Sequence, residues 1–260
     1  MISILKRFAR PLRSKAGSLY QPASASQATI NLSVETSAYT APFFTGEGDL
    51  IYSIPSYSQE GEDMILKRVY DGVSEGFYID VGAHHPKRFS NTYFFYEIGW
   101  SGINIDATPG SMRLFEAERP RDVNIEAAIA SEQKEMTFFI FNEPALNSFD
   151  EELSRSRVTD QHFIVKEQKI ITKTLKGILA EHLPKDQKVN FLSIDVEGLD
   201  LDALKSNDWQ LCRPEYILVE CFGMGIREIQ SSEVYTLLAQ HDYDFFAKTV
   251  NTVFFKDTLL

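Results

Sequence analysis

Carboxylates at the ends of apolar runs are the residues of this chain best suited to chemistry. Asp80, Asp106 and Asp195 each close a short apolar run, and Glu220 lies near the end of a fourth. In a parallel sheet the carboxyl ends of the strands share one rim, where the ligand crevice lies. An acid there can bind ribose hydroxyls or accept a proton, although it can also merely cap the next helix. Four acids on one rim favour a ligand site.

The stretch from Gly76 to Ser90 predicts how the first of these acids is presented. The apolar run Phe77-Tyr78-Ile79, bounded by glycines, is typical of a fully buried strand. Gly82 lacks a Cβ and would let the backbone approach a ligand closely. Taken alone, the same residues are also compatible with a tight strand-to-helix connection that binds nothing, because isolated glycine motifs are weak.

Strand-like and helix-like segments alternate along the rest of the chain. This alternation predicts an α/β fold with a mostly parallel sheet and helices on both faces. The segment 143–161 is polar and loop-like, and 243–256 predicts two closing antiparallel strands that turn around Asn251. We expect the remaining strands within 77–82, 101–107, 123–130, 136–142, 163–172, 189–195 and 215–221, and helices within 64–70, 92–100, 109–118, 174–182, 199–205 and 233–241.

The composition bounds the class of protein. The 260 residues are 43% hydrophobic, which is ample for a substantial core, and the net charge of -11 argues against nonspecific nucleic-acid binding. The two cysteines, Cys212 and Cys221, are spaced neither as a disulfide framework nor as a metal-binding pair. This cysteine usage predicts a reducing, cytoplasmic setting.

The first 50 residues differ from the rest. The first twenty contain five basic residues and no acidic one, and the stretch that follows is rich in Ser, Ala and Thr. We expect residues 1–50 to form a low-order basic extension and residues 51–260 to form the domain. Such a basic segment is compatible with weak peripheral contact at the inner face of a membrane.

A dinucleotide site is the main competitor for the predicted crevice. Asp106 lies 24 residues after Gly82, near the spacing at which an acid binds a ribose in such sites. The turn reads Gly82-Ala83-His84-His85-Pro86, however, and lacks the second and third glycines that admit a pyrophosphate. A ligand with an adenosine and no pyrophosphate fits better, and S-adenosylmethionine is such a ligand.

Several motifs together resemble the FkbM family of S-adenosylmethionine-dependent methyltransferases. They occur in the family's order and spacing over about residues 57–221, namely SQEGED (58–63), FYIDVGAHHP (77–86), GINIDATP (102–109), SIDVEGLD (193–200) and PEYILVE (214–220). The resemblance implies a Rossmann-like class I methyltransferase fold with S-adenosyl-L-methionine as cofactor. The family commonly has Asn and Gly where this chain has His84 and Pro86.

The resemblance also implies roles for individual residues. It places the ribose hydroxyls on Asp106 and the methionine part of the cofactor beside the turn after the first strand. It places Asp195 and Glu197 next to the site of methyl transfer. The residues expected around the cofactor are Gln59, Glu60, Asp80, Gly82, Ala83, His84 and Asp106.

Methylation of a hydroxyl requires a group that removes its proton. We expect Asp195 first in this role, then His85 or His84, then Glu197. Each has a structural alternative, because the histidines can order their loop and Glu197 can orient the helix after it. Asp195, Glu197 and Glu220 could also ligate a divalent metal, but no spacing here is diagnostic, and we expect no required metal.

The family contains O-methyltransferases of sugars and of other natural products. We therefore expect an O-methyltransferase acting on a hydroxyl of a saccharide or glycan, in polysaccharide modification. The alternative is an inactive nucleotide- or glycan-binding module on the same fold. Loops at the rim usually determine acceptor choice, and the expected acceptor residues within 142–162 and after Cys221 include Asn147, Ser148, Phe222 and Arg227.

Overall fold

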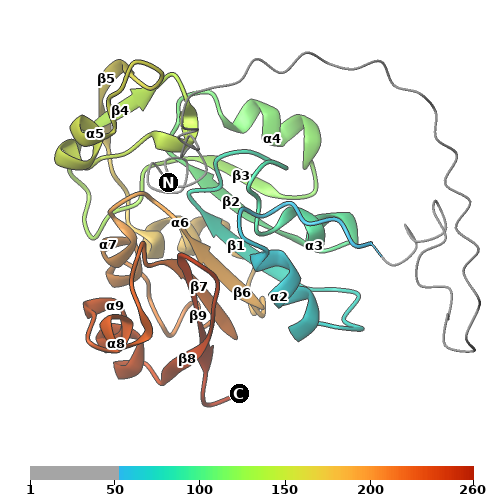
Figure 1. The fold of residues 1–260 in the computed structure, drawn as a ribbon. Coiled ribbons are helices and arrows are strands. Elements are labelled where there is room, and N and C mark those ends of the chain that lie inside the picture. The colour runs from blue at the N-terminus through green and yellow to red at the C-terminus, as the bar shows by residue number, and fades with distance from the viewer. Residues whose placement is uncertain (1–52) are drawn as a thin grey trace, which may run out of the picture. The chain divides into compact units, whose positions relative to one another are not determined.

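A seven-stranded sheet organises the part of the chain that the computed structural model describes, residues 53–260 (Figure 1). Its strand order is β3-β2-β1-β6-β7-β9-β8, and the first five strands in that order are parallel. The C-terminal strands β9 and β8 pair antiparallel at one edge. The predicted fold class is therefore confirmed. The strands are β1 (Phe77–Val81), β2 (Ser101–Asp106), β3 (Val123–Glu126), β6 (Phe191–Ile194), β7 (Tyr216–Glu220), β8 (Tyr243–Lys248) and β9 (Thr252–Asp257).

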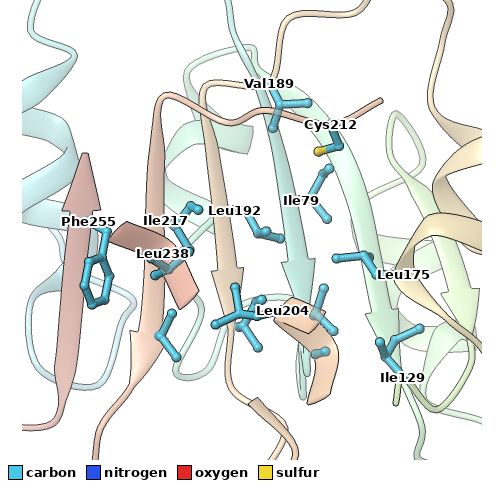
Figure 2. Packing of buried hydrophobic residues seen from close by; sticks show 14 of the residues in the cluster. Ile79, Ile129, Leu175, Val189, Leu192, Leu204, Cys212, Ile217, Leu238 and Phe255 are labelled. Carbon is cyan, nitrogen blue, oxygen red and sulfur yellow. The ribbon is translucent and has the colours of Figure 1, made fainter. Parts of the chain in front are cut away.

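Side chains alternate between the two faces of this sheet, as strand geometry requires. One face is aliphatic, with Ile79, Leu192 and Ile217 from three neighbouring strands packed under Leu204 and Leu238 (Figure 2). The helices that cover this face are α6 (Leu175–His182), α7 (Asp200–Lys205), α8 (Ile226–Gln230) and α9 (Glu233–Gln240).

The opposite face is aromatic. Tyr78 and Phe191 from the strands pack with Trp100, which is 1% exposed. Gly102 is required there, because a Cβ at that position would overlap the Tyr78 ring on the neighbouring strand. The helices α2 (Glu62–Val69) and α3 (Tyr93–Glu97) cover this face, and α4 (Met112–Glu118) packs beside the turn after β1.

Two expectations about elements were wrong. The helix expected over 109–118 begins at Met112, because the residues from Pro109 form turns before it. The segment expected to be a loop, 143–161, contains the 3₁₀ helix η2 (Pro144–Leu146) and the helix α5 (Glu151–Arg157). Asp150 caps α5 by accepting from the Leu153 amide, which is a motif that the sequence shows and that we overlooked.

One hairpin lies outside the main sheet. Strands β4 (Glu135–Phe141) and β5 (Ile164–Ile171) pair antiparallel as a separate two-stranded sheet. Helix α5 follows β4 in the chain and lies with this hairpin on one side of the molecule (Figure 1). The hairpin and α5 thus form an insertion between β3 and the second half of the parallel sheet.

Candidate active site

The strand register aligns the predicted acids on one rim. The Asp195 amide donates to the Val81 carbonyl at 2.9 Å, and the Gly82 amide donates to the Ile105 carbonyl at 2.8 Å. The turn after β1 therefore lies between the end of β2, which carries Asp106, and the end of β6, which is followed by Asp195. Glu220 is the last residue of β7, the next strand along.

Gly82 is required for a structural reason that we did not predict, while its predicted close approach to a ligand stays a prediction. Its φ is +86°, in the left-handed region, and a Cβ there would overlap the carbonyl oxygen of Asp195. The glycine thus allows the turn after β1 to pack against the backbone that follows β6. Ala83, the next residue, is buried against Met112 and Phe115 of α4.

Asp106 is held by the loops on both of its sides. Its Oδ2 accepts from the His84 amide at 2.9 Å, and its Oδ1 accepts from the Thr108 amide at 2.7 Å. The side chain is 7% exposed. Since a carboxylate oxygen has two acceptor positions, each oxygen can still accept from a ribose hydroxyl.

His84 occupies a strained position beside Asp106. Its φ is +54°, unusual for a residue with a Cβ, and its ring stacks on Phe89 at a centroid distance of 6.1 Å. Burial lowers the pKa of His84, which keeps the imidazole neutral. Its Nε2 is buried and has no hydrogen-bond partner among residues 53–260. Buried polar atoms in proteins normally have a hydrogen-bond partner. An unpaired one next to the predicted ribose-binding acid is expected where a bound ligand would supply that partner.

His85 serves the loop itself. Its Nδ1 accepts from the amides of Lys87 at 3.0 Å and Arg88 at 2.9 Å, so the neutral ring carries its proton on Nε2. Burial lowers the pKa of His85, and the neighbouring positive charges of Arg88 and Lys87 lower it further. A neutral ring of this tautomer has no free acceptor nitrogen, so this geometry favours the structural alternative over proton abstraction.

Asp80 belongs to a buried network that we did not predict from the sequence. Arg119, which is 0% exposed, donates to Asp122 at 2.8 Å, to the Tyr78 hydroxyl at 2.8 Å and to Thr92 at 3.0 Å. The Thr92 hydroxyl in turn donates to Asp80 at 2.9 Å. Burial raises the pKa of Asp80 to about 6. Arg119 thereby connects the strand that carries Asp80 to the start of α3.

The other half of the rim holds acids with few partners. Although part of Asp195 is exposed, its Oδ1 is buried and accepts no hydrogen bond from the part of the chain that the structure describes. Burial raises the pKa of Asp195 well above its usual range, and repulsion by Glu220 and Glu197 adds to this. Burial and then the charge of Glu197 raise the pKa of Glu220 to about 8. The structure thus brings together three of the acids that the sequence singled out.

Glu197 is fixed by a residue that we missed. Arg157, at the end of α5, pairs with its carboxylate at 2.5 Å, and this pair is almost fully buried. The Ser148 hydroxyl donates to the Glu197 carbonyl at 2.7 Å. Glu197 has a φ of +52° in a turn whose amides at Val196 and Gly198 both donate to the Asp200 carboxylate.

The segment 143–161 crosses the rim from one half to the other. Asn147 donates to the Thr108 hydroxyl at 3.1 Å, just beyond Asp106, and accepts from the Phe141 amide at 2.8 Å. Ser148 reaches Glu197, as described above. The side chains of Asn147 and Ser148 are both buried and bonded within the protein. They shape the rim, and their expected contact with the acceptor stays a prediction.

Glu60, one of the two predicted pocket residues that precede β1, forms a clamp with the turn between β8 and β9. Glu60 accepts from the Asn251 amide and side chain, both at 2.7 Å, and from Thr249 at 2.8 Å. These residues form the β8–β9 turn, next to Thr252, which pairs with Glu220. Glu60 therefore lies at the rim, while Gln59 is exposed. Their contact with the cofactor stays a prediction.

Comparison with known proteins identifies the family. The sequence matches the Methyltransferase FkbM domain over residues 80–245, which is more than half of the chain. The chain belongs to the FkbM methyltransferase family. No curated protein matches it. A TehB-like SAM-dependent methyltransferase from Corynebacterium glutamicum aligns over 81% of this chain and 94% of its own, with 7% identity and a TM-score of 0.38, which is too low to support an argument.

FkbM-family membership implies S-adenosylmethionine as the cofactor, and the residues present fit it. The buried Asp106 carboxylate retains acceptor positions for ribose hydroxyls, and the buried Nε2 of His84 lacks a partner within the described residues. The turn after β1 joins these groups to Asp195 on the next strand. The cofactor roles assigned to individual residues stay predictions that the experiments below address.

Proposed function

We propose that this FkbM-family methyltransferase is an O-methyltransferase that methylates a hydroxyl of a saccharide or glycan, in polysaccharide modification in the cytoplasm. One observation carries the proposal. The turn after β1 packs against the backbone of Asp195, whose carboxylate accepts no hydrogen bond from residues 53–260. A basic group with free acceptor capacity thus lies directly beside the predicted cofactor loop.

When bound, S-adenosylmethionine supplies a methyl group on a sulfonium sulfur. Asp195 would orient the acceptor hydroxyl and take its proton as the oxygen–carbon bond forms and the sulfur–carbon bond breaks. Positioning supplies much of the acceleration in such an in-line displacement, and a positioned base adds about 10²- to 10⁴-fold. Glu197, fixed by Arg157, would hold the turn that presents Asp195.

Surface features near the rim support a saccharide acceptor. Phe222 follows Cys221 in the loop after β7 and is 44% exposed. Exposed aromatic rings can stack on sugar faces. Arg227, near the start of the helix α8 that follows this loop, is exposed and could bind hydroxyl groups. No helix within residues 53–260 is long and apolar enough to cross a membrane. Membrane contact through the basic extension concerns residues outside the described part and stays a prediction.

The test is a transfer assay with methyl-labelled cofactor and a panel of saccharide, peptide and small-alcohol acceptors. We expect label on a saccharide as an ether, which survives mild base. Label released by base would indicate a methyl ester, and label on peptide would indicate another acceptor class; both would contradict the proposal. Calorimetry with S-adenosylmethionine distinguishes the enzyme from the alternative, because binding without transfer to any acceptor indicates an inactive binding module.

A further inference from the structure

Three carboxylates converge at the ends of two neighbouring strands. Asp195 and Glu197 follow β6, and Glu220 ends β7, which is paired with β6 through Ile194 and Val219. One carboxylate oxygen from each of the three lies within 4.8 Å of the others. Because like charges at this separation repel, a fold gains nothing from such a group unless another charge compensates it.

Asp195 shows that this compensation is incomplete within the described residues. Its Oδ1 has no solvent access and no hydrogen-bond partner. Buried carboxylates in the other half of the rim are satisfied, since Asp106 accepts two amides and Asp80 accepts the Thr92 hydroxyl. Native proteins pair nearly all buried polar atoms, and a persistent exception often marks the place of an ion or ligand. The unpaired oxygen belongs to the same group that approaches Glu197 and Glu220.

The three carboxylates have too little positive charge around them to balance their own. Arg157 pairs with Glu197 at 2.5 Å, and no other ion pair within residues 53–260 involves any of the three acids. When the three carboxylates are ionised, one arginine leaves two negative charges. A divalent cation would balance these two charges.

We propose that Asp195, Glu197 and Glu220 bind one hard divalent cation of the Mg²⁺, Mn²⁺ or Ca²⁺ class. Oxygen-only ligands of this kind are what such cations prefer. Adjacent oxygens around a bound Ca²⁺ lie about 3.4 Å apart, and those around Mg²⁺ about 3.0 Å, so the three side chains would move together by about 1 to 2 Å to coordinate one ion. Three protein ligands leave further positions for water or for a hydroxyl oxygen.

The role of this cation in catalysis rests on the proposed function. A cation at this place would take the acceptor hydroxyl oxygen as a ligand, polarise its O–H bond and fix its position. Coordination through one oxygen of Asp195 leaves the second oxygen to accept the proton. The cation would therefore add substrate orientation to the role already given to Asp195.

Binding is tested with Mn²⁺ alone, on the full chain stripped of metal by a chelator. Free Mn²⁺ is measured by electron paramagnetic resonance, without cofactor or acceptor. We expect one site per chain, with affinity reduced at least about 10-fold in Asp195→Asn and in Glu220→Gln. Removing one of several repelling carboxylates should leave the fold intact, and circular dichroism of each variant checks this. Competition by Mg²⁺ and Ca²⁺ then ranks the cations.

Glu215→Gln is the matched control, because Glu215 lies just before the opposite end of β7 and pairs with Lys188. It should bind Mn²⁺ as the unmodified chain does. Absence of a site in the unmodified chain, or equal losses in Glu220→Gln and Glu215→Gln, would overturn the proposal. Because this assay uses no methyl transfer, its failure leaves the proposed function standing, and a failed transfer assay leaves the cation site standing.

Discussion

The two halves of the rim treat their carboxylates in opposite ways. In the half formed by β1 and β2, Asp80 and Asp106 accept hydrogen bonds from the protein, and Arg119 lies behind them. In the half formed by β6 and β7, Asp195 accepts none at its buried oxygen, and it lies among other acids. The carboxylates of the first half have partners within the described residues, although His84 Nε2 beside them has none, whereas the carboxylates of the second half still lack partners for their charges.

This difference separates binding from reaction. A site that recognises a fixed feature, such as a ribose, gains from a carboxylate that is already oriented, since less freedom is lost on binding. A group that accepts a proton must keep acceptor capacity free. The same residue type thus serves two purposes, which are set by the number of donors around it. Four substitutions test this division.

Asp195→Asn should reduce methyl transfer by about 10²- to 10⁴-fold, because it removes the proton acceptor. The cofactor affinity should change far less than the rate, since the Asp195 carboxylate is assigned to the acceptor hydroxyl and Asp106 is assigned to the ribose. Labelled transfer and calorimetry measure the two quantities, with Glu215→Gln as the control. An undiminished rate would show that Asp195 is not the base and that the two halves of the rim do not differ in this way.

Arg157→Met should destabilise the fold by about 3 kcal/mol, because it leaves the nearly buried Glu197 carboxylate without its partner. Urea denaturation gives the free energy of unfolding. The double change Arg157→Met with Glu197→Gln should recover much of this loss, since the unpaired charge is then absent. No recovery would mean that Arg157 acts mainly through its bond to the Leu146 carbonyl at 3.2 Å.

Asp80→Asn should change how stability depends on pH. The folded-state pKa of Asp80, about 6, is above its ordinary value of 3.8, so the folded protein binds this proton more tightly than the unfolded chain does. This stabilisation is complete below pH 3.8 and is lost as pH rises through 6. It corresponds to about 3 kcal/mol over the window.

Between about pH 4 and pH 6, the unmodified chain should therefore lose stability relative to the Asp80→Asn variant. Above pH 6 the difference between the two should stay level. Urea denaturation at several pH values measures this difference. Asp186→Asn, at an exposed left-handed turn position that asparagine tolerates, is the matched control. Parallel profiles for the unmodified chain and Asp80→Asn would show that Asp80 does not titrate in this range.

Asp106→Ala should weaken S-adenosylmethionine binding by about 10-fold or more, which is about 1.4 kcal/mol, because a charged acceptor for the ribose is lost. Calorimetry measures the affinity. Glu135→Gln, on the separate β4–β5 hairpin, should bind the cofactor normally. Unchanged affinity in Asp106→Ala would refute the ribose assignment and leave the ordered half of the rim without a ligand.

The sequence predicted the parallel sheet and the acids on its rim, because buried strands and the residues that close them are local patterns. Asp80, Asp106 and Asp195 could each be placed from a short apolar run and its end. The helix α6 was predicted from Thr174, which does cap it by accepting from the Gly177 amide at 3.1 Å. Local rules suffice where the cause of a structure lies within a few residues.

Contacts between distant segments could not be predicted in this way. Arg119 precedes a proline in a polar stretch that is typical of the surface, and its burial depends on Tyr78 and Thr92 from two distant segments as well as on nearby Asp122. Arg157 required both the missed helix α5 and its approach to Glu197. Which nitrogen of His85 accepts from the loop amides is likewise a matter of three-dimensional geometry.

The clamp made by Glu60 has a consequence for the order in which the domain is completed. Glu60 precedes the first strand, yet it accepts from Asn251, 191 residues later. Asn251 also accepts from the Gly223 amide at 3.3 Å, so this turn reaches the loop after β7 as well. During synthesis, the segment that contains Glu60 cannot form these contacts until almost the last residues have been made. Contacts between residues so far apart in the chain form late. A chain that stops before the C-terminal hairpin can contain all the acids of the rim and still leave it open.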